Sequence, residues 1–156
     1  MTASNETAFQ LVTDAVCRYA TGLDTADASL LRSAFTSNAI LDLSGLSVLG
    51  LQFPPFQGRE TIVDVCMKYV GEALDTSHTL SNFRVKVDGE RDAKMSYLVE
   101  ARHFRKGQSL SLEEKEDFCT KSVYEGAVTV EDGEWRLTTL SVRPMWCTGN
   151  VDVMKG

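Results

Sequence analysis

The chain contains two histidines, and each lies in a segment of strand-like sequence beside polar residues. An imidazole can accept or donate a proton near neutral pH, so two imidazoles in one pocket suffice for acid–base chemistry without a metal or cofactor. Asp24, after the first helical segment, could orient one of the rings through a hydrogen bond. If the fold brings Asp24, His78 and His103 together, we therefore expect one imidazole oriented by Asp24 and a second imidazole opposite it, enough for acid–base catalysis.

Each of these residues also has a purely structural interpretation. His78 could be a half-exposed strand histidine, and His103 could be a hydrogen-bonded core histidine at the end of an apolar strand face. Asp24 could cap the helix that follows it. Capping and catalysis are compatible, because backbone donors would hold the carboxylate in place.

Six further residues could line a substrate pocket: Tyr19, Asp42, Tyr97, Tyr124, Arg143 and Trp146. Tyr19 belongs to a helical apolar stripe and Tyr97 to the strand face of the second histidine, so core packing is the alternative for both. Asp42 could point into a pocket or outward. Arg143 could bind an oxyanion or be solvated, and Trp146 could cover the sheet or an interface.

Common catalytic and metal-binding motifs are absent from the sequence: GxSxG, GxxxxGK[ST], HExxH and GxGxxG do not occur. The four cysteines include no CxxC pair. We expect reduced, structural cysteines, with Cys17 and Cys66 buried in helices. The sequence therefore predicts neither a bound metal nor a cofactor.

Length and composition predict one folded domain over residues 1–156, since 43% of the 156 residues are hydrophobic. The net charge of -6 gives no basic footprint for nucleic acid. No apolar stretch approaches the roughly 18 residues of a membrane span, and residues 1–6 lack the basic and apolar regions of a secretory signal. We expect a soluble, cytoplasmic protein with no membrane or nucleic-acid partner.

The first half of the chain has helical periodicity. Residues 9–23 carry apolar side chains at spacings of three and four, and Gly22 suits a helix stop. Asp24 or Thr25 would cap a second helix that carries residues 30–35, followed by a short strand at residues 39–43. The Gly- and Pro-containing segment 44–58 is irregular and apolar enough to cover a pocket, and a third helix is expected at residues 59–74.

The second half changes to the period of two that is typical of strands. Alternating residues 83–88 lead to a turn at Asp88-Gly89, and residues 93–103 place every second side chain, ending in His103, on one face. Residues 105–117 form a polar connection before strands at 118–130 and 135–143, which residues 131–134 join as a hairpin. Three helices followed by long strands predict an α+β fold, with helices on one face of a curved antiparallel sheet.

The order of these segments resembles the SnoaL-like branch of the NTF2-like superfamily, and within it the scytalone dehydratase-like proteins. The segments that carry the resemblance are RYATGLDTAD (18–27), LRSAFTSNA (31–39), GRETI (58–62), SHTLSNF (77–83) and DGEWRL (132–137), with Trp146 and residues 149–150 beyond them. The resemblance implies a cone-shaped α+β barrel, a curved sheet wrapped around three N-terminal helices with a deep apolar pocket inside. It also implies a homodimer.

The resemblance further implies roles for individual residues. In scytalone dehydratase-like enzymes an aspartate after the first helix orients a histidine on the first long strand, and a second histidine lies on the next strand; Asp24, His78 and His103 match these positions. The resemblance thus implies that His78 is the base, Asp24 its orienting carboxylate, and His103 a second acid–base group or substrate anchor. Tyr19 has the spacing of a tyrosine found in some dehydratases. Leu23 departs from the tyrosine that precedes the aspartate in scytalone dehydratase, which puts its water-polarising role and its substrate in doubt here.

Together these observations predict a cofactor-independent dehydratase, isomerase or cyclase. Its substrate would be a small apolar molecule, a polyketide- or terpenoid-like secondary-metabolite intermediate enclosed in the pocket. Two alternatives remain open. One is a non-catalytic NTF2-like module for ligand binding or assembly, and the other is an accessory subunit resembling the small subunit of ring-hydroxylating dioxygenases.

Overall fold

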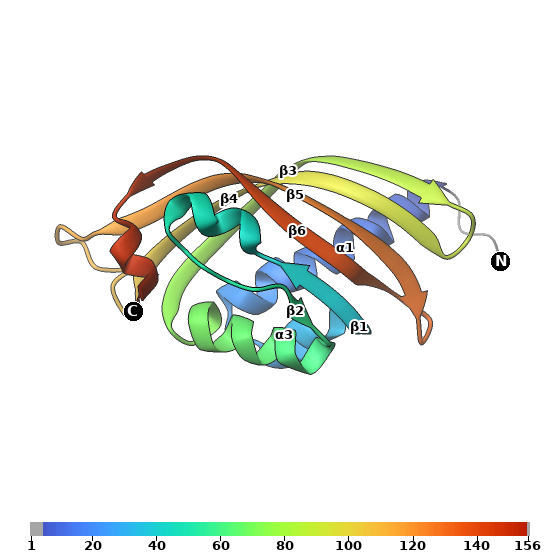
Figure 1. The fold of residues 1–156 in the computed structure, drawn as a ribbon, viewed down its shortest axis with the longest axis horizontal. Coiled ribbons are helices and arrows are strands. Elements are labelled where there is room, and N and C mark those ends of the chain that lie inside the picture. Colours follow the sequence, from blue (N-terminus) through green and yellow to red (C-terminus); the bar gives the residue numbers. More distant parts are fainter. Residues whose placement is uncertain (1–4, 156) are drawn as a thin grey trace.

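A curved six-stranded sheet wraps around the N-terminal helices in the computed structural model, which describes residues 5–155 (Figure 1). The helices are α1 (Asn5–Asp24), α2 (Ala28–Ser33) and α3 (Arg59–Cys66), with shorter turns η1 (Ser44–Leu49), η2 (Met67–Gly71) and η3 (Val151–Lys155). The strands are β1 (Phe35–Asp42), β2 (Phe56–Gln57), β3 (Leu74–Asp88), β4 (Asp92–Arg105), β5 (Asp117–Glu131) and β6 (Glu134–Gly149). The predicted α+β class is confirmed.

The strand order is β2-β1-β6-β5-β4-β3, so β3 lies at one edge of the sheet. The strands β3 to β6 form an antiparallel meander, as predicted, but β1 pairs with β6 in parallel. The expectation of a wholly antiparallel sheet is therefore wrong at this pair. The two strands are far apart in the chain, with η1, β2, α3, η2 and the strands β3 to β5 between them, so the long connection that a parallel pair requires is available.

The first helix extends beyond Gly22, the expected stop, to Asp24. A β-carbon at Gly22 would lie 2.8 Å from the backbone nitrogen of Leu31, so the glycine allows α2 to pack closely against α1. The residue that caps α2 is Asp27, whose carboxylate accepts a hydrogen bond from the backbone N–H of Leu30 at 2.9 Å. The predicted cap at Asp24 or Thr25 is wrong, and the carboxylate of Asp24 is free for another partner.

The third helix is shorter than the predicted span of residues 59–74. It ends at Cys66, continues as the π-helical turn η2, and gives way to β3 at Leu74. Leu74 pairs with Arg105 of β4, and these strand hydrogen bonds determine where helical structure must end. The prediction that Cys17 is buried is also wrong, since Cys17 lies on the exposed side of α1, whereas Cys66 is buried.

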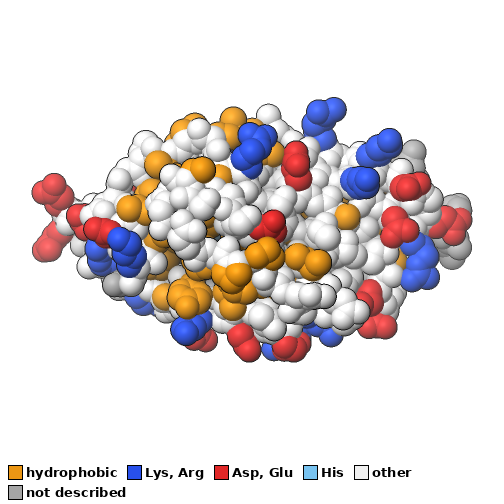
Figure 2. Space-filling view, in the orientation of Figure 1, with side chains coloured by type: hydrophobic (Ala, Val, Ile, Leu, Met, Phe, Trp, Pro, Cys, Tyr) orange, Lys and Arg blue, Asp and Glu red, His pale blue; other side chains and the backbone are white. Residues whose placement is uncertain are grey.

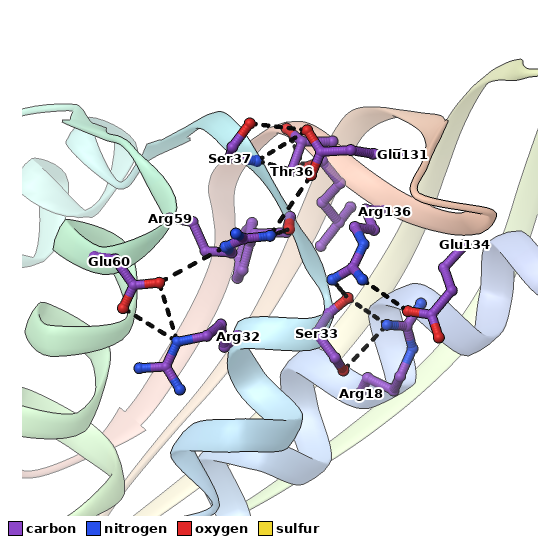
Figure 3. A network of polar contacts seen from close by, with 12 residues as sticks. Arg18, Arg32, Ser33, Thr36, Ser37, Arg59, Glu60, Glu131, Glu134 and Arg136 are labelled. Carbon is purple, nitrogen blue, oxygen red and sulfur yellow. Dashed lines mark hydrogen bonds and ion pairs between the residues drawn. The ribbon is translucent and has the colours of Figure 1, made fainter.

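The end of the sheet near the β5–β6 hairpin is joined to the helices by a network of arginines (Figure 3). Arg18 of α1 donates to the carbonyl oxygens of Ser33 and of Trp135, the latter at 2.6 Å, and Arg136 donates to the same Ser33 carbonyl at 2.9 Å. Glu131 accepts a hydrogen bond from the backbone N–H of Ser37 at 3.0 Å. These contacts satisfy backbone carbonyls at the end of α2 and hold both helices on the sheet.

The surface mixes charged side chains of both signs, and hydrophobic ones gather over the region of η1, β2 and α3 (Figure 2). In that region the ring of Phe53 contacts the rings of Phe56 and Tyr69, with centroids 6.3 and 5.9 Å away. Among the described residues, no helix is both long and apolar enough to cross a membrane.

Candidate active site

Asp24 and His78 form a direct contact where the end of α1 meets the edge strand β3. The Nδ1 atom of His78 lies 2.6 Å from Oδ1 of Asp24, and the side chain of His78 is 6% exposed. A carboxylate can only accept, so Nδ1 carries the hydrogen and Nε2 carries the free lone pair. The predicted pairing of these two residues is present in the fold, with the tautomer that leaves Nε2 available as a base.

The Asp24 carboxylate is held by two further donors. The backbone N–H of His78 donates to Oδ2 at 2.8 Å, and the hydroxyl of Thr76 donates to Oδ1 at 2.8 Å. Burial alone would raise the pKa of Asp24, but the hydrogen bonds and charge interaction with His78 and the Thr76 hydroxyl together lower it. Asp24 is therefore ionised at neutral pH and able to stabilise an imidazolium at His78.

His103 is held in a different way. Its Nδ1 lies 3.0 Å from the carbonyl oxygen of Phe118, which can only accept, so Nδ1 carries the hydrogen and Nε2 is again a lone-pair acceptor. Burial, and then the charge of the neighbouring His78, lower the pKa of His103 to about 4. At neutral pH His103 is uncharged, which favours a role as an acceptor or anchor over that of a proton donor.

The two imidazoles face one cavity. Across β3 and β4, His78 lies opposite Ala101, and His103 lies opposite Thr76. The histidines therefore occupy diagonal positions on the same face of the sheet. Their ring centroids are 5.9 Å apart. The cavity between them has a volume of about 70 Å³. A larger, open depression of about 670 Å³ elsewhere, lined by residues such as Phe9 and Lys94, contains none of the three predicted catalytic residues.

The walls of the cavity differ in chemistry. Most of the apolar part comes from the helices and covering segments, and the sheet adds two residues: Leu23, Leu43, Leu46, Leu49, Leu51, Val70 and Met154, with Ala101 and Phe118 of the sheet. Leu46, Leu49 and Leu51 lie in the irregular segment that was expected to cover a pocket, and the structure confirms this. Hydroxyl groups come from Tyr19 of α1 and from Thr120, Ser122 and Tyr124 of β5.

Of the six predicted substrate-binding residues, the structure places two at the cavity and four away from it. Tyr19 and Tyr124 line the cavity. Tyr97 instead lies within the core, stacked against Phe83 and Tyr124 with ring centroids 5.3 and 5.5 Å away. Its placement matches the core-packing alternative, because its ring extends between neighbouring aromatic side chains rather than into the cavity.

Three of the six lie outside the cavity, and their prediction as pocket residues is not matched by their placement. Asp42 accepts a hydrogen bond from the backbone N–H of Ser44 at 2.9 Å, in a turn at the end of β1. Arg143 is exposed because Val142, its neighbour on β6, faces the interior. Trp146 is 45% exposed on the outside of the same strand.

Sequence reasoning missed Thr76, Thr120 and Ser122. The signal was present for the last two, since they alternate with Tyr124 along one face of β5 in the period of a strand. Among the residues that the structure describes, no three His, Cys, Asp or Glu side chains gather as metal ligands.

A helix-filled cone with a carboxylate–imidazole pair at its cavity defines a protein of the NTF2-like fold class. Residues 9–141 match the SnoaL-like domain family, and the chain belongs to this family. Terrestric acid biosynthesis cluster protein E of Penicillium crustosum is 28% identical over 145 residues, which make up 89% of this chain and 84% of the relative. Family membership and this relative support an enzyme-type role.

Solved structures share the fold. The Kfla4162 protein of Kribbella flavida has a TM-score of 0.82 at 17% identity, covering 98% of this chain and 100% of that one. A candidate scytalone dehydratase of Novosphingobium aromaticivorans has a TM-score of 0.77 at 20% identity, covering 96% of this chain and 92% of that one. The LinA-type3 hexachlorocyclohexane dehydrochlorinase of Novosphingobium barchaimii has a TM-score of 0.73 at 17% identity, covering 92% of this chain and 90% of that one. At these identities the similarity establishes the fold.

Proposed function

We propose that the protein is a cofactor-independent lyase or isomerase in which His78 removes a proton from a carbon atom beside a carbonyl group. The observation that carries the proposal is the 2.6 Å contact between Asp24 and His78 at the wall of an internal cavity. A non-catalytic binding module would not require an oriented, buried base there. The site therefore favours an enzyme over the alternative of a ligand-binding or assembly module.

The first step uses the Nε2 lone pair of His78. As the C–H bond breaks, its proton forms an N–H bond on Nε2, and the electron pair passes into the substrate as an enolate. Asp24 stabilises the imidazolium through Nδ1–H and keeps the ring in place. General base catalysis of this kind contributes about 10²–10⁴-fold to a rate.

The second step returns the proton. In a dehydration, the enolate electron pair forms a carbon–carbon double bond as the C–O bond of a β-hydroxyl breaks, and the His78 imidazolium protonates the departing oxygen to give water. In an isomerisation, the same proton is returned to another carbon. His103, neutral and with its Nε2 free, would accept a hydrogen bond from the substrate hydroxyl and direct it toward His78.

The chemistry of the cavity supports a neutral, largely apolar substrate. Among the described residues that line it, none is Lys, Arg, Asp or Glu. A substrate carboxylate or phosphate would lose its hydration there without gaining a cationic partner, which costs several kcal/mol. The relative in a biosynthesis cluster supports a secondary-metabolite intermediate as the substrate.

The cavity volume of about 70 Å³ is well below the roughly 300–1,000 Å³ of typical small-molecule sites. A polyketide- or terpenoid-sized substrate therefore requires the walls to move apart. Leu46, Leu49 and Leu51 near η1 and Met154 in η3 belong to short segments outside the sheet. We propose that these segments move outward to admit the substrate, since the sheet wall is held by continuous strand pairing.

The test is turnover of a panel of neutral β-hydroxy ketones, followed by mass spectrometry for loss of water and, in D₂O, for deuterium uptake at carbon. We expect the wild-type protein to convert at least one compound and His78→Ala to do so about 10²–10⁴-fold more slowly. Ser77→Ala, on the exposed face of the same strand, is the matched control and should retain full activity. Equal rates in His78→Ala and wild type, or neither water loss nor exchange with any compound, would contradict the proposal.

A further inference from the structure

The connection between β4 and β5, residues 106–116, presents two leucines to solvent. Leu110 is 92% exposed and Leu112 is fully exposed. The connection is held in turns by its own hydrogen bonds, such as the one from the backbone N–H of Ser111 to the carbonyl oxygen of Gln108 at 3.1 Å. One exposed leucine is ordinary on a protein surface. Two on the same short turn form an apolar tip without a covering partner in the fold.

Unpaired acidic groups follow the leucines directly. Glu113 and Glu114 come next in the chain, and neither carboxylate has an ion-pair partner among the described residues. The nearby Glu116, by contrast, lies 3.4 Å from Arg105. Residues 110–114, which we call the acidic loop, therefore combine an apolar tip with two free negative charges.

The open depression of about 670 Å³ has complementary apolar chemistry. It lies beside the first turns of α1 and the edge strand β3. Phe9 of α1, which is 42% exposed, contributes an aromatic ring, and Phe83 and Val85 of β3 extend the apolar wall. An apolar side chain from a partner could displace water from this wall, which favours association.

Three cations border the same depression: Arg84, Lys86 and Lys94. All three are exposed, and in the part of the chain that the structure describes none of them has an ion-pair partner. Lys86 lies directly opposite Lys94 across β3 and β4, and like charges in such positions destabilise strand pairing. Glu125 adds one negative charge, which leaves the border net positive and suited to an acidic partner.

The acidic loop cannot reach the depression of its own chain. Strand β4 lies between the two features, and from Lys94 to Arg105 it covers about 35 Å at the usual rise of a strand. The β3–β4 hairpin and the β4–β5 connection lie at opposite ends of the molecule (Figure 1). A matching loop must therefore come from another copy of the chain.

We propose that this chain associates head to tail with a second copy, the acidic loop of one copy occupying the depression of the other. The two leucines would contact the apolar wall around Phe9, and the free glutamates would face Lys86 and Lys94. A segment this short buries less than the roughly 1,200–2,000 Å² of stable interfaces, so the association is weak and reversible. The contact is heterologous, so each pair keeps one free loop and one free depression. It does not depend on the chemistry proposed for His78.

Sedimentation velocity at protein concentrations from about 10 μM to 1 mM tests the contact. We expect the mean mass of the wild type to rise with concentration, and to rise less at about 0.5 M NaCl, because salt screens exposed charges. Leu110→Asp/Leu112→Asp and Lys86→Glu/Lys94→Glu should each weaken association by about tenfold or more, as loss of an anchoring contact does. The replaced side chains are all exposed, and thermal unfolding verifies that both variants fold.

Val48→Asp/Lys68→Glu is the matched control. It changes an exposed apolar side chain and an exposed lysine, as the test variants do, at positions outside the acidic loop and the depression. Association should remain that of the wild type. An equal loss in this variant would overturn the proposal, because the effect would then follow from surface charge in general.

A mixture of the two test variants examines the head-to-tail geometry. The leucine variant keeps a working depression and the lysine variant keeps a working loop, so an equimolar mixture should form pairs that neither variant forms alone. A contact between two loops, or between two depressions, would not be restored by mixing. The proposal is wrong if the wild type does not associate, if both test variants associate as the wild type does, or if the mixture gains no mass over its components.

Discussion

The ring of His78 meets the ring of His103 edge to face, with their planes 87° apart. The two imidazoles are not equivalent, because a carboxylate holds the first and a backbone carbonyl holds the second. An ionised partner stabilises a protonated ring far more than a neutral carbonyl does. The pair therefore divides into a base that can take up a proton and a neutral acceptor.

Asp24→Asn should greatly reduce turnover while the protein remains folded. An amide NH₂ facing Nδ1 of His78 would favour the tautomer with hydrogen on Nε2, which removes the lone pair that acts as the base. We expect a fall of about 10²–10⁴-fold in kcat.

Asp27→Asn provides the control for that change, measured under the same steady-state conditions. Asp27 caps α2, and asparagine is an equally good capping residue. Activity should stay within about twofold of wild type. An Asp24→Asn enzyme with full activity would show that the carboxylate is structural.

The stability of the protein should fall as the pH drops from about 6.5 to about 4. The pKa of His103 is lowered to about 4 in the folded state, so between these values the unfolded chain binds more protons than the folded one. The free energy of unfolding should decrease by about 2–3 kcal/mol across this interval. Urea denaturation at several pH values measures the effect.

His103→Gln should weaken that pH dependence, because glutamine does not titrate. The lowered pKa of Asp24 acts in the same direction, but mainly below about pH 5, where the unfolded carboxyl begins to take up protons, so it overlaps only the lower end of this interval. Identical slopes in the variant and the wild type between about pH 4 and 6.5 would show that His103 is not the group responsible.

Gly22→Ala should destabilise the protein although alanine is the better helix former. The added β-carbon would lie 2.8 Å from the backbone nitrogen of Leu31, and a backbone atom of α2 cannot move aside without shifting the helix. Overpacking of this kind costs about 1–3 kcal/mol. Urea denaturation should show the loss, with Thr21→Ala at the exposed neighbouring position close to wild type. A stabilised Gly22→Ala protein would contradict the close packing of α1 and α2.

Glu131→Gln should lower stability and leave turnover unchanged. Glu131 accepts from the backbone and the hydroxyl of Ser37 and lies 3.5 Å from Arg59, in the network remote from the histidines (Figure 3). Replacing a half-buried, charge-assisted acceptor by a neutral one costs about 1 kcal/mol. Glu134→Gln, more exposed in its pair with Arg136, should change stability by less than about 0.5 kcal/mol. Equal losses in thermal unfolding of both variants would contradict this ranking.

Strand periodicity determined much of the second half of the molecule. The alternation along β4 predicted that Tyr97, Ala101 and His103 share a buried face, and the structure confirms it. In the structure Tyr124 lies on the same inward face of β5 as Thr120 and Ser122, because alternate side chains of a strand point to the same side of the sheet. The α+β class followed from the change of period between the two halves of the chain.

Other features depended on contacts between distant segments. Local sequence could not show whether Asp24 or Asp27 caps α2, because both precede it and both can accept from a helix N-terminus; the close approach of Leu31 to Gly22 leaves that role to Asp27. Local sequence also could not show where Asp42 points: its carboxylate accepts a hydrogen bond from the backbone N–H of Ser44 and does not face the pocket. The sequence by itself determined the elements and the faces of the strands, since those follow from local periodicity. Tertiary structure alone decided that Asp24 meets His78, that His103 is neutral, and which hydroxyls border the cavity, because these depend on burial and distance between segments far apart in the chain.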